Sequence, residues 1–156
     1  MVMLTAAKVG SRSHGIEVLE SRTQVAVDFM KAILADGTVP PHFGHLVSFQ
    51  QENAATKIEE AYVVDGVHPT HIFINNYVFS DSNNQSIAKR LHLTDFKMLI
   101  WCCDQNTTDN LGLKNLVKMG DMEVKINHKT KYKMYAYMKV TSCTLMDIVS
   151  MHEYTA

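Results

Sequence analysis

The stretch KNLVKMGDMEVKINHKTKYKMYAYMK, residues 114–139, decides the expected fold. Apolar and polar side chains alternate along two runs within it, 122–127 and 131–139, which the polar link 128–130 separates. A period of two is typical of strands that bury one face and leave the other in water. The stretch therefore predicts a β-hairpin with one face in a core and one face toward solvent.

The second run of this hairpin assigns side chains to the two faces. The inward face is expected to carry Tyr132, Met134, Ala136 and Met138, and the solvent face Lys131, Lys133, Tyr135, Tyr137 and Lys139. Residues 114–139 hold seven of the 15 Lys and Arg but only two of the 16 acids, Asp121 and Glu123. The solvent face is thus expected to be cationic, although the same lysines could serve only to keep an exposed strand soluble and unpaired.

Helical and strand patterns alternate along the rest of the chain. Helices are expected over about 24–35, with Thr23 as cap and Gly37 as end, and over 85–91, 111–117 and 144–151. Short strands are expected over 16–20 and 46–49, a longer one over 71–79, and a buried one over 96–103. Two segments, 24–35 and 51–64, fit either a helix or a strand, and the Asp65-Gly66 pair predicts a turn between two strands of a hairpin.

These patterns predict an α+β fold. We expect a mainly antiparallel sheet of about five strands with three or four helices, because the last strands are joined by a tight turn. Residues 1–15 lack periodicity and are expected to form a flexible N-terminal arm, followed by a single domain over 16–156.

Composition narrows the class of protein. A hydrophobic fraction of 46% and a charged fraction of 20% are typical of a globular domain, and a net charge of −1 argues against a general polyanion binder. Three cysteines do not make a disulfide framework, and no run reaches the ~20 apolar residues that a transmembrane helix needs. The chain is therefore expected to be intracellular, either cytoplasmic or nuclear.

Histidine offers a second candidate site. Two His-x-x-His pairs, His42 with His45 and His68 with His71, could supply four imidazoles to a zinc ion. The spacing differs from that of a metalloprotease helix, and loop packing explains the same residues without metal. The expectation is no cofactor, with zinc as the alternative.

Other catalytic constellations are weak. Cys102 and Cys103 flank a run of large apolar residues and are expected to be small structural residues in a strand, since a reactive thiol needs a lowered pKa and partial exposure. The seven glycines are scattered singly, so the sequence holds no glycine-rich phosphate loop.

The sequence therefore favours a non-enzymatic, self-associating structural or binding protein, such as a viral matrix-type or nucleic-acid-associated protein. Its anionic partner, RNA, DNA or an anionic membrane surface, would meet Lys125, Lys131, Lys133, Tyr135, Tyr137 and Lys139. The alternative is a small His-rich metal-binding protein or enzyme, or a small-molecule binding module.

Overall fold

A computed structural model describes residues 10–125 and 131–140 of the chain. Contacts divide the chain into two compact units, Met1–Thr56 and Lys57–Ala156, each of which has its own sheet. The single domain expected over 16–156 stays a prediction. The helix expected over 144–151 and the polar link 128–130 lie outside the described residues.

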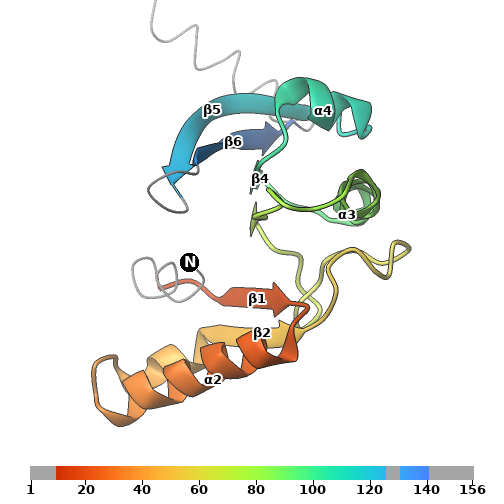
Figure 1. Ribbon diagram of the computed structural model, residues 1–156. Helices are drawn as coiled ribbons and strands as arrows, with labels where there is room; N and C mark the ends of the chain where they lie inside the picture. Colours follow the sequence, from red (N-terminus) through yellow and green to blue (C-terminus); the bar gives the residue numbers. More distant parts are fainter. Residues whose placement is uncertain (1–9, 126–130, 141–156) are drawn as a thin grey trace, which may run out of the picture. The chain divides into compact units, whose positions relative to one another are not determined.

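The first unit is a strand–helix–strand motif. It contains β1 (Ser13–Glu17), α2 (Glu20–Ala35), the 3-10 helix η1 (Pro41–His45) and β2 (Val47–Gln51). The two strands are parallel neighbours, and α2 forms the crossover between them (Figure 1). β1 begins at Ser13, within the segment predicted as an arm.

The segment 24–35 is helical, which resolves the ambiguity of its sequence pattern. Met30 is buried and packs in a small core with Phe43 and Val47. The helix starts earlier than predicted, so Thr23 is no cap; its hydroxyl lies inside the first turns and donates to the Leu19 carbonyl at 3.3 Å. Gly37 follows the helix with a φ of 74°, the left-handed conformation that favours glycine after a helix end.

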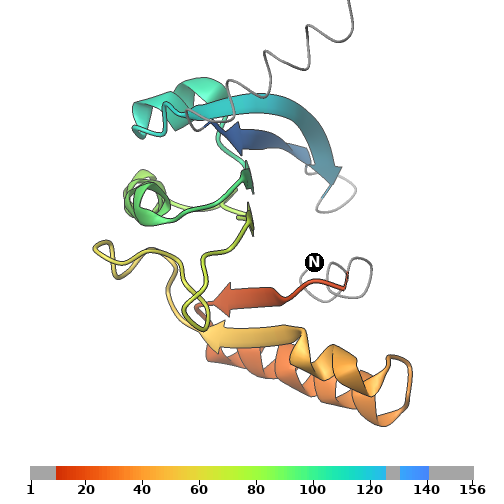
Figure 2. The ribbon, with the colours of Figure 1, turned by 180° about the vertical axis from the view of Figure 1, so that it is seen from behind.

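The second unit is built on a four-stranded sheet. Its elements are β3 (His71–Phe73), α3 (Asp81–Leu93), β4 (Met98–Trp101), α4 (Gln105–Asn110), β5 (Leu116–Lys125) and β6 (Lys131–Lys139). The strand order is β3-β4-β6-β5; β3 and β4 are parallel, and β6 runs antiparallel to both of its neighbours (Figures 1 and 2).

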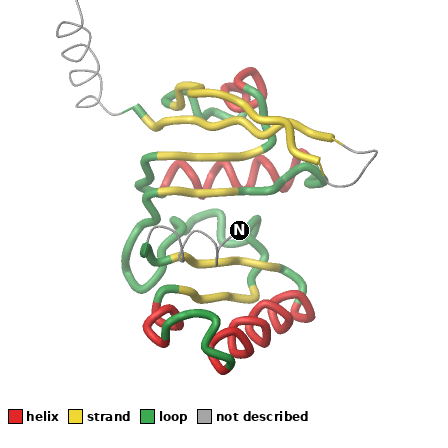
Figure 3. The backbone as a smooth tube through the Cα atoms, turned by 90° about the vertical axis from the view of Figure 1, so that its left-hand side faces the viewer, coloured by secondary structure: helices red, strands yellow, loops and turns green. Residues whose placement is uncertain are grey.

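Both helices of the second unit lie on the same side of its sheet (Figure 3). Leu99 and Trp101 are fully buried, and their partners in the register of β6 are Tyr137 and Tyr135. The inward residues predicted for the helix near 85–91, Ile87, Ala88 and Leu91, are all buried. This side of the sheet therefore holds the main core of the unit.

The α+β class is confirmed, with three α-helices among the described residues, but the predicted sheet is wrong. Six strands form two sheets, and the pairs β1–β2 and β3–β4 are parallel. The turn at Asp65-Gly66 exists, yet it closes only an isolated bridge between Val64 and Val67, because β3 pairs with the later strand β4 instead. In the part of the chain that is described, no helix is long and apolar enough to span a bilayer.

Three further segments differ from the sequence reading. Residues 52–64 form turns and loops apart from the bridge at Val64, so neither the helix nor the strand expected over 51–64 is present. The helix expected over 111–117 is wrong: α4 lies earlier, in a segment predicted as a loop, and β5 begins at Leu116. The strand expected over 71–79 ends at Phe73.

The C-terminal hairpin is confirmed, but several of its side chains do not lie on the predicted faces. Met134 is 1% exposed, whereas Lys131 and Lys133 face solvent as predicted. Tyr137 was expected on the solvent face, but it is 0% exposed. The reason is the position of β6 between β4 and β5: an interior strand can be covered on both faces, so alternation does not identify a solvent side there.

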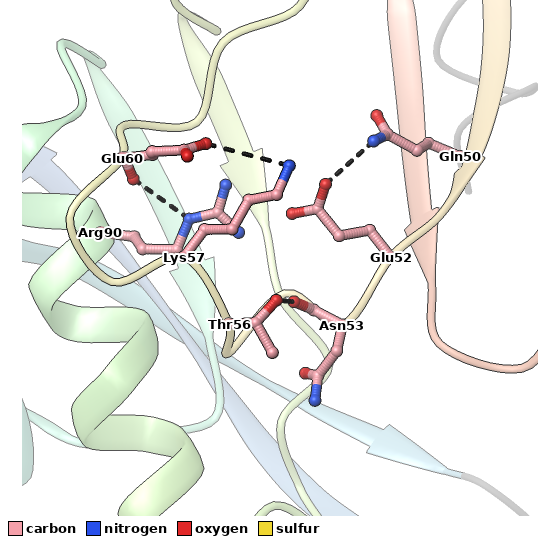
Figure 4. Close-up of polar contacts among 7 residues, drawn as sticks. All are labelled: Gln50, Glu52, Asn53, Thr56, Lys57, Glu60 and Arg90. Atoms are coloured by element: carbon pink, nitrogen blue, oxygen red, sulfur yellow. Dashed lines mark hydrogen bonds and ion pairs between the residues drawn. The ribbon is translucent and has the colours of Figure 1, made fainter.

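A buried arginine ties the loop that opens the second unit to α3. Arg90 is 4% exposed, its Nε donates to the Glu60 carbonyl at 3.2 Å, and its guanidinium lies 4.0 Å from the centre of the Tyr62 ring. Figure 4 shows this arginine beside the Lys57–Glu60 ion pair. Hydrogen bonding and cation–π contact thus compensate the burial of a charge.

Candidate functional site

A cleft of about 230 Å³ opens at the carboxyl ends of the parallel strands β3 and β4. Its lining residues come from five elements or the loops that follow them: Asn76, Tyr77, Phe79, Asn84, Cys102, Cys103, Asp104, Thr107 and Tyr135. The chain leaves both strands at this edge, which brings together residues that are about 27 positions apart, such as Asn76 and Cys103. In open α/β sheets, ligands bind outside the carboxyl ends of the strands.

Asn76 is the organising residue of the cleft. Its side chain is buried, and its Oδ1 accepts a hydrogen bond from the Cys102 backbone N–H at 2.8 Å. Its Nδ2 donates to Asn84 Oδ1 at 2.8 Å and to Cys103 Sγ at 3.2 Å. One amide therefore joins the end of β3, the end of β4 and α3, and fixes the shape of the cleft.

Aromatic rings form one part of the cleft wall. Tyr77 and Phe79 follow β3 and remain partly exposed, and the Tyr77 ring stacks on Tyr132 with centroids 4.7 Å apart. Tyr135 comes from β6, and the Lys118 ammonium lies 5.0 Å from the centre of its ring. Aromatic side chains that line a cleft can offer a negative π-surface to a cation.

Asp104 supplies the negative charge of the cleft. It caps α4, since its carboxylate accepts the Thr107 backbone N–H at 2.8 Å. This hydrogen bond lowers the pKa of Asp104 below its ordinary value of 3.8, and the charge of Lys118 lowers it further. Asp104 is therefore a carboxylate at neutral pH.

The two adjacent thiols were expected in a strand, but they follow β4 and line the cleft. Burial is the largest cause that raises the pKa of both Cys102 and Cys103 above the ordinary value. Both are free cysteines that stay protonated at neutral pH, which disfavours a nucleophilic role.

The residues predicted to meet an anionic partner do not form one open cationic face. Lys131 pairs with Glu123 at 2.8 Å, and Lys133 lies 3.7 Å from Asp121. Lys118 also pairs with Asp121, at 2.6 Å. The two acids in the stretch are thus placed to neutralise its lysines, an arrangement that net charge along the sequence does not reveal.

The other residues of that predicted set either make contacts within the fold or lie away from a shared cationic face. Lys139 donates to the Thr94 carbonyl at 2.8 Å and lies over the Phe96 ring at 4.7 Å. Tyr137 donates to the Cys103 carbonyl at 2.9 Å, and burial raises its pKa to about 12, so the phenol stays protonated. Lys125 ends β5 and is exposed, and Tyr135 lines the cleft.

The two histidine pairs lie in different units. His42 and His45 are exposed on η1 of the first unit. In the second unit, His68 Nδ1 accepts the Asp95 backbone N–H at 3.1 Å, and His71 Nδ1 lies 2.9 Å from the Thr70 hydroxyl. Over the described residues, no three or more His, Cys, Asp or Glu side chains gather as metal ligands do. The zinc site stays a prediction.

Sequence reasoning missed Asn76, Asp104 and their cleft. A usable signal was present, because Asn75-Asn76 follows one apolar strand and Cys102-Cys103-Asp104 follows the next. Polar residues at the ends of two successive strands point to a shared edge only if those strands are parallel. The expected antiparallel hairpin concealed this signal.

The sequence matches no family model and no curated protein. Among solved structures, the chain is similar to the N-methyltransferase NodS from Bradyrhizobium japonicum WM9, with a TM-score of 0.51. The identity is 7%, and the match covers 89% of this chain and 93% of that one. At this identity the likeness concerns the fold. The solved structure is that of an enzyme, and this finding contradicts the prediction of a non-enzymatic, self-associating structural protein with a cationic hairpin.

Proposed function

We propose that this chain transfers a methyl group to the nitrogen of a small amine or an amine side chain held in the cleft at the ends of β3 and β4. The observation that carries the proposal is this cleft, which combines a carboxylate with aromatic rings at the carboxyl edge of parallel strands. The likeness in fold to an N-methyltransferase supports the reaction class.

The chemistry of the cleft suits an amine that gains positive charge. A nitrogen lone pair must form the new N–C bond, and a sulfonium donor supplies the methyl group as its S–C bond breaks. Positive charge passes from sulfur to nitrogen in that step. The Asp104 carboxylate and the rings of Tyr77 and Tyr135 are held in place beforehand, so they stabilise this charge without reorganisation.

The size of the cleft limits the acceptor. Sites for drug-sized ligands enclose roughly 300–1,000 Å³, whereas this cleft offers about 230 Å³. The acceptor is therefore an alkyl amine of a few heavy atoms or one extended side chain that ends in an amine.

The first unit has features that suit a nucleoside-bearing methyl donor. Glu52 directly follows β2, the second strand of the pair, where a carboxylate in nucleotide-binding parallel sheets accepts ribose hydroxyls, and Glu17 ends the neighbouring strand β1. The chain has no glycine between Gly15 and Gly37, so the loop before α2 lacks the cradle that pyrophosphate needs. A nucleoside without phosphates fits these residues better than a dinucleotide.

Glu17 provides a test of this donor site. Its Oε1 accepts the Leu19 backbone N–H at 3.0 Å, a bond that a glutamine oxygen can also accept. Glu17→Gln is expected to weaken the binding of S-adenosylmethionine about fivefold, because hydrogen bonds to a charged acceptor are stronger. Equilibrium dialysis measures this change. Glu20→Gln, at the exposed start of α2, is the matched control, and equal affinities in both variants would remove Glu17 from the donor site.

The proposed reaction is tested directly with the full chain. Purified protein is incubated with S-adenosylmethionine carrying an isotopically labelled methyl group, together with n-butylamine or lysine-containing peptides. Mass spectrometry is expected to detect N-methylated product that is absent with n-butanol as acceptor and after heat inactivation. Transfer to none of the amines, with a folded protein that binds the donor, would contradict the proposal.

A further inference from the structure

Lys118 lies against the two groups of the cleft that a cationic amine would use. Its ammonium is 5.0 Å from the ring centre of Tyr135, which lines the cleft, and its charge acts on Asp104, which also lines it. Asp121 holds the ammonium in this place at 2.6 Å. An exposed lysine, which does not itself line the cleft, therefore stands beside one of its aromatic residues.

This neighbouring cation has a consequence for ligands of different charge. A cation over one aromatic ring opposes a second cation near the same ring, and it offsets part of the attraction of a neighbouring carboxylate. A neutral ligand of equal shape does not experience this opposition. Lys118 can thus lower the affinity for a cationic ligand relative to a neutral one without changing the shape of the cleft.

We infer that Lys118 is a specificity-determining residue that weakens the binding of permanently charged quaternary ammonium groups in the cleft. This inference rests on the proposed function and deepens it. Successive methylations of an amine end in a quaternary ammonium, which rings and a carboxylate would otherwise retain. By opposing that cation, Lys118 favours release of the fully methylated product and selects acceptors that can bind as neutral amines.

The test compares two probes of nearly equal shape, choline and its neutral carbon isostere 3,3-dimethyl-1-butanol. Binding of each to the full-length protein is measured by calorimetry or by ligand-observed NMR. Lys118→Met is expected to tighten choline binding about threefold to fivefold, in line with the strength of a single exposed cation–π or ionic contact. The affinity for the alcohol is expected to stay within twofold.

Two controls separate charge from folding. Lys114→Met removes the same charge from the loop before β5 and is expected to leave choline binding unchanged. Lys118→Arg keeps the charge and is expected to bind choline as the wild type does. Equal choline affinity in wild type and Lys118→Met would overturn the inference, as would tightening of both probes together. The proposed function fails separately, through the absence of methyl transfer to amines in the isotope assay.

Discussion

Replacement of Asn76 by alanine is expected to cause the largest loss of both activity and stability. The buried amide makes three hydrogen bonds, so its removal leaves the Cys102 backbone N–H and the Asn84 side chain without their partner. Because an unsatisfied buried polar group costs about 1–3 kcal/mol, the free energy of unfolding should fall by about 2–4 kcal/mol. Methyl transfer should fall at least about a hundredfold, since displacement of a cleft wall by an ångström has an effect of this size.

Urea denaturation and the isotope assay measure the two effects of Asn76→Ala. The comparison variant is Asn83→Ala on the first turn of α3, where the residue is exposed and only its backbone N–H contacts Ser80. That variant is expected to keep both stability and transfer. Full activity in Asn76→Ala at a temperature where it stays folded would show that the amide does not shape the reacting site.

Local pattern predicted several elements correctly because their apolar periodicity agrees with their burial. The helix near 85–91 places Ile87, Ala88 and Leu91 inward at helical spacing, and the strand near 96–103 contains the fully buried Leu99 and Trp101. The hairpin of β5 and β6 follows from alternation over two long runs. In these elements, local preference and tertiary packing favour the same structure.

Pairing between strands distant in sequence could not be read in the same way. The run from His71 to Phe79 is rich in β-forming residues, yet only its first three residues join the sheet, because Asn76 turns its side chain to the end of β4. α4 was overlooked because its residues are polar. It depends on the Asp104 cap and on Thr108, which is fully buried and donates to the Asp104 carbonyl at 2.7 Å. Neither of these contacts produces a hydrophobic periodicity in the sequence.

The candidate site was not predicted, because the lysines of the C-terminal hairpin were expected to be available to a partner. The sequence shows only that residues 114–139 are rich in lysine. In the structure, Lys131 forms an ion pair with Glu123 and Lys133 with Asp121 across the hairpin. Which residues face each other across two strands depends on the register of those strands. The sizes and charges of residues that are neighbours in the sequence do not specify this register. The charge that matters for the proposed function is instead the carboxylate of Asp104, which follows the short strand β4 and caps α4.

Replacement of Asp104 by asparagine isolates the charge of the cleft from its structure. Asparagine caps helices as well as aspartate does, so its side-chain oxygen can still accept the Thr107 N–H and α4 should persist. Loss of the carboxylate should weaken the binding of a cationic probe such as choline about threefold, because Asp104 is exposed and exposed ion pairs contribute at most about 1 kcal/mol. Binding of 3,3-dimethyl-1-butanol should change little.

The pH dependence of the wild type gives an independent check on Asp104. The pKa of this group is lowered from 3.8, first by the Thr107 backbone hydrogen bond, so the carboxylate is more than half ionised at pH 3.8 and nearly fully charged from about pH 5 upward. Choline has no titrating proton, and its affinity should therefore be constant from about pH 5 upward and should fall only as the pH drops below the ordinary aspartate range. Asp104→Asn should show no such fall. A decline in choline affinity that begins near neutral pH, or one that persists in Asp104→Asn, would show that another group binds the cation.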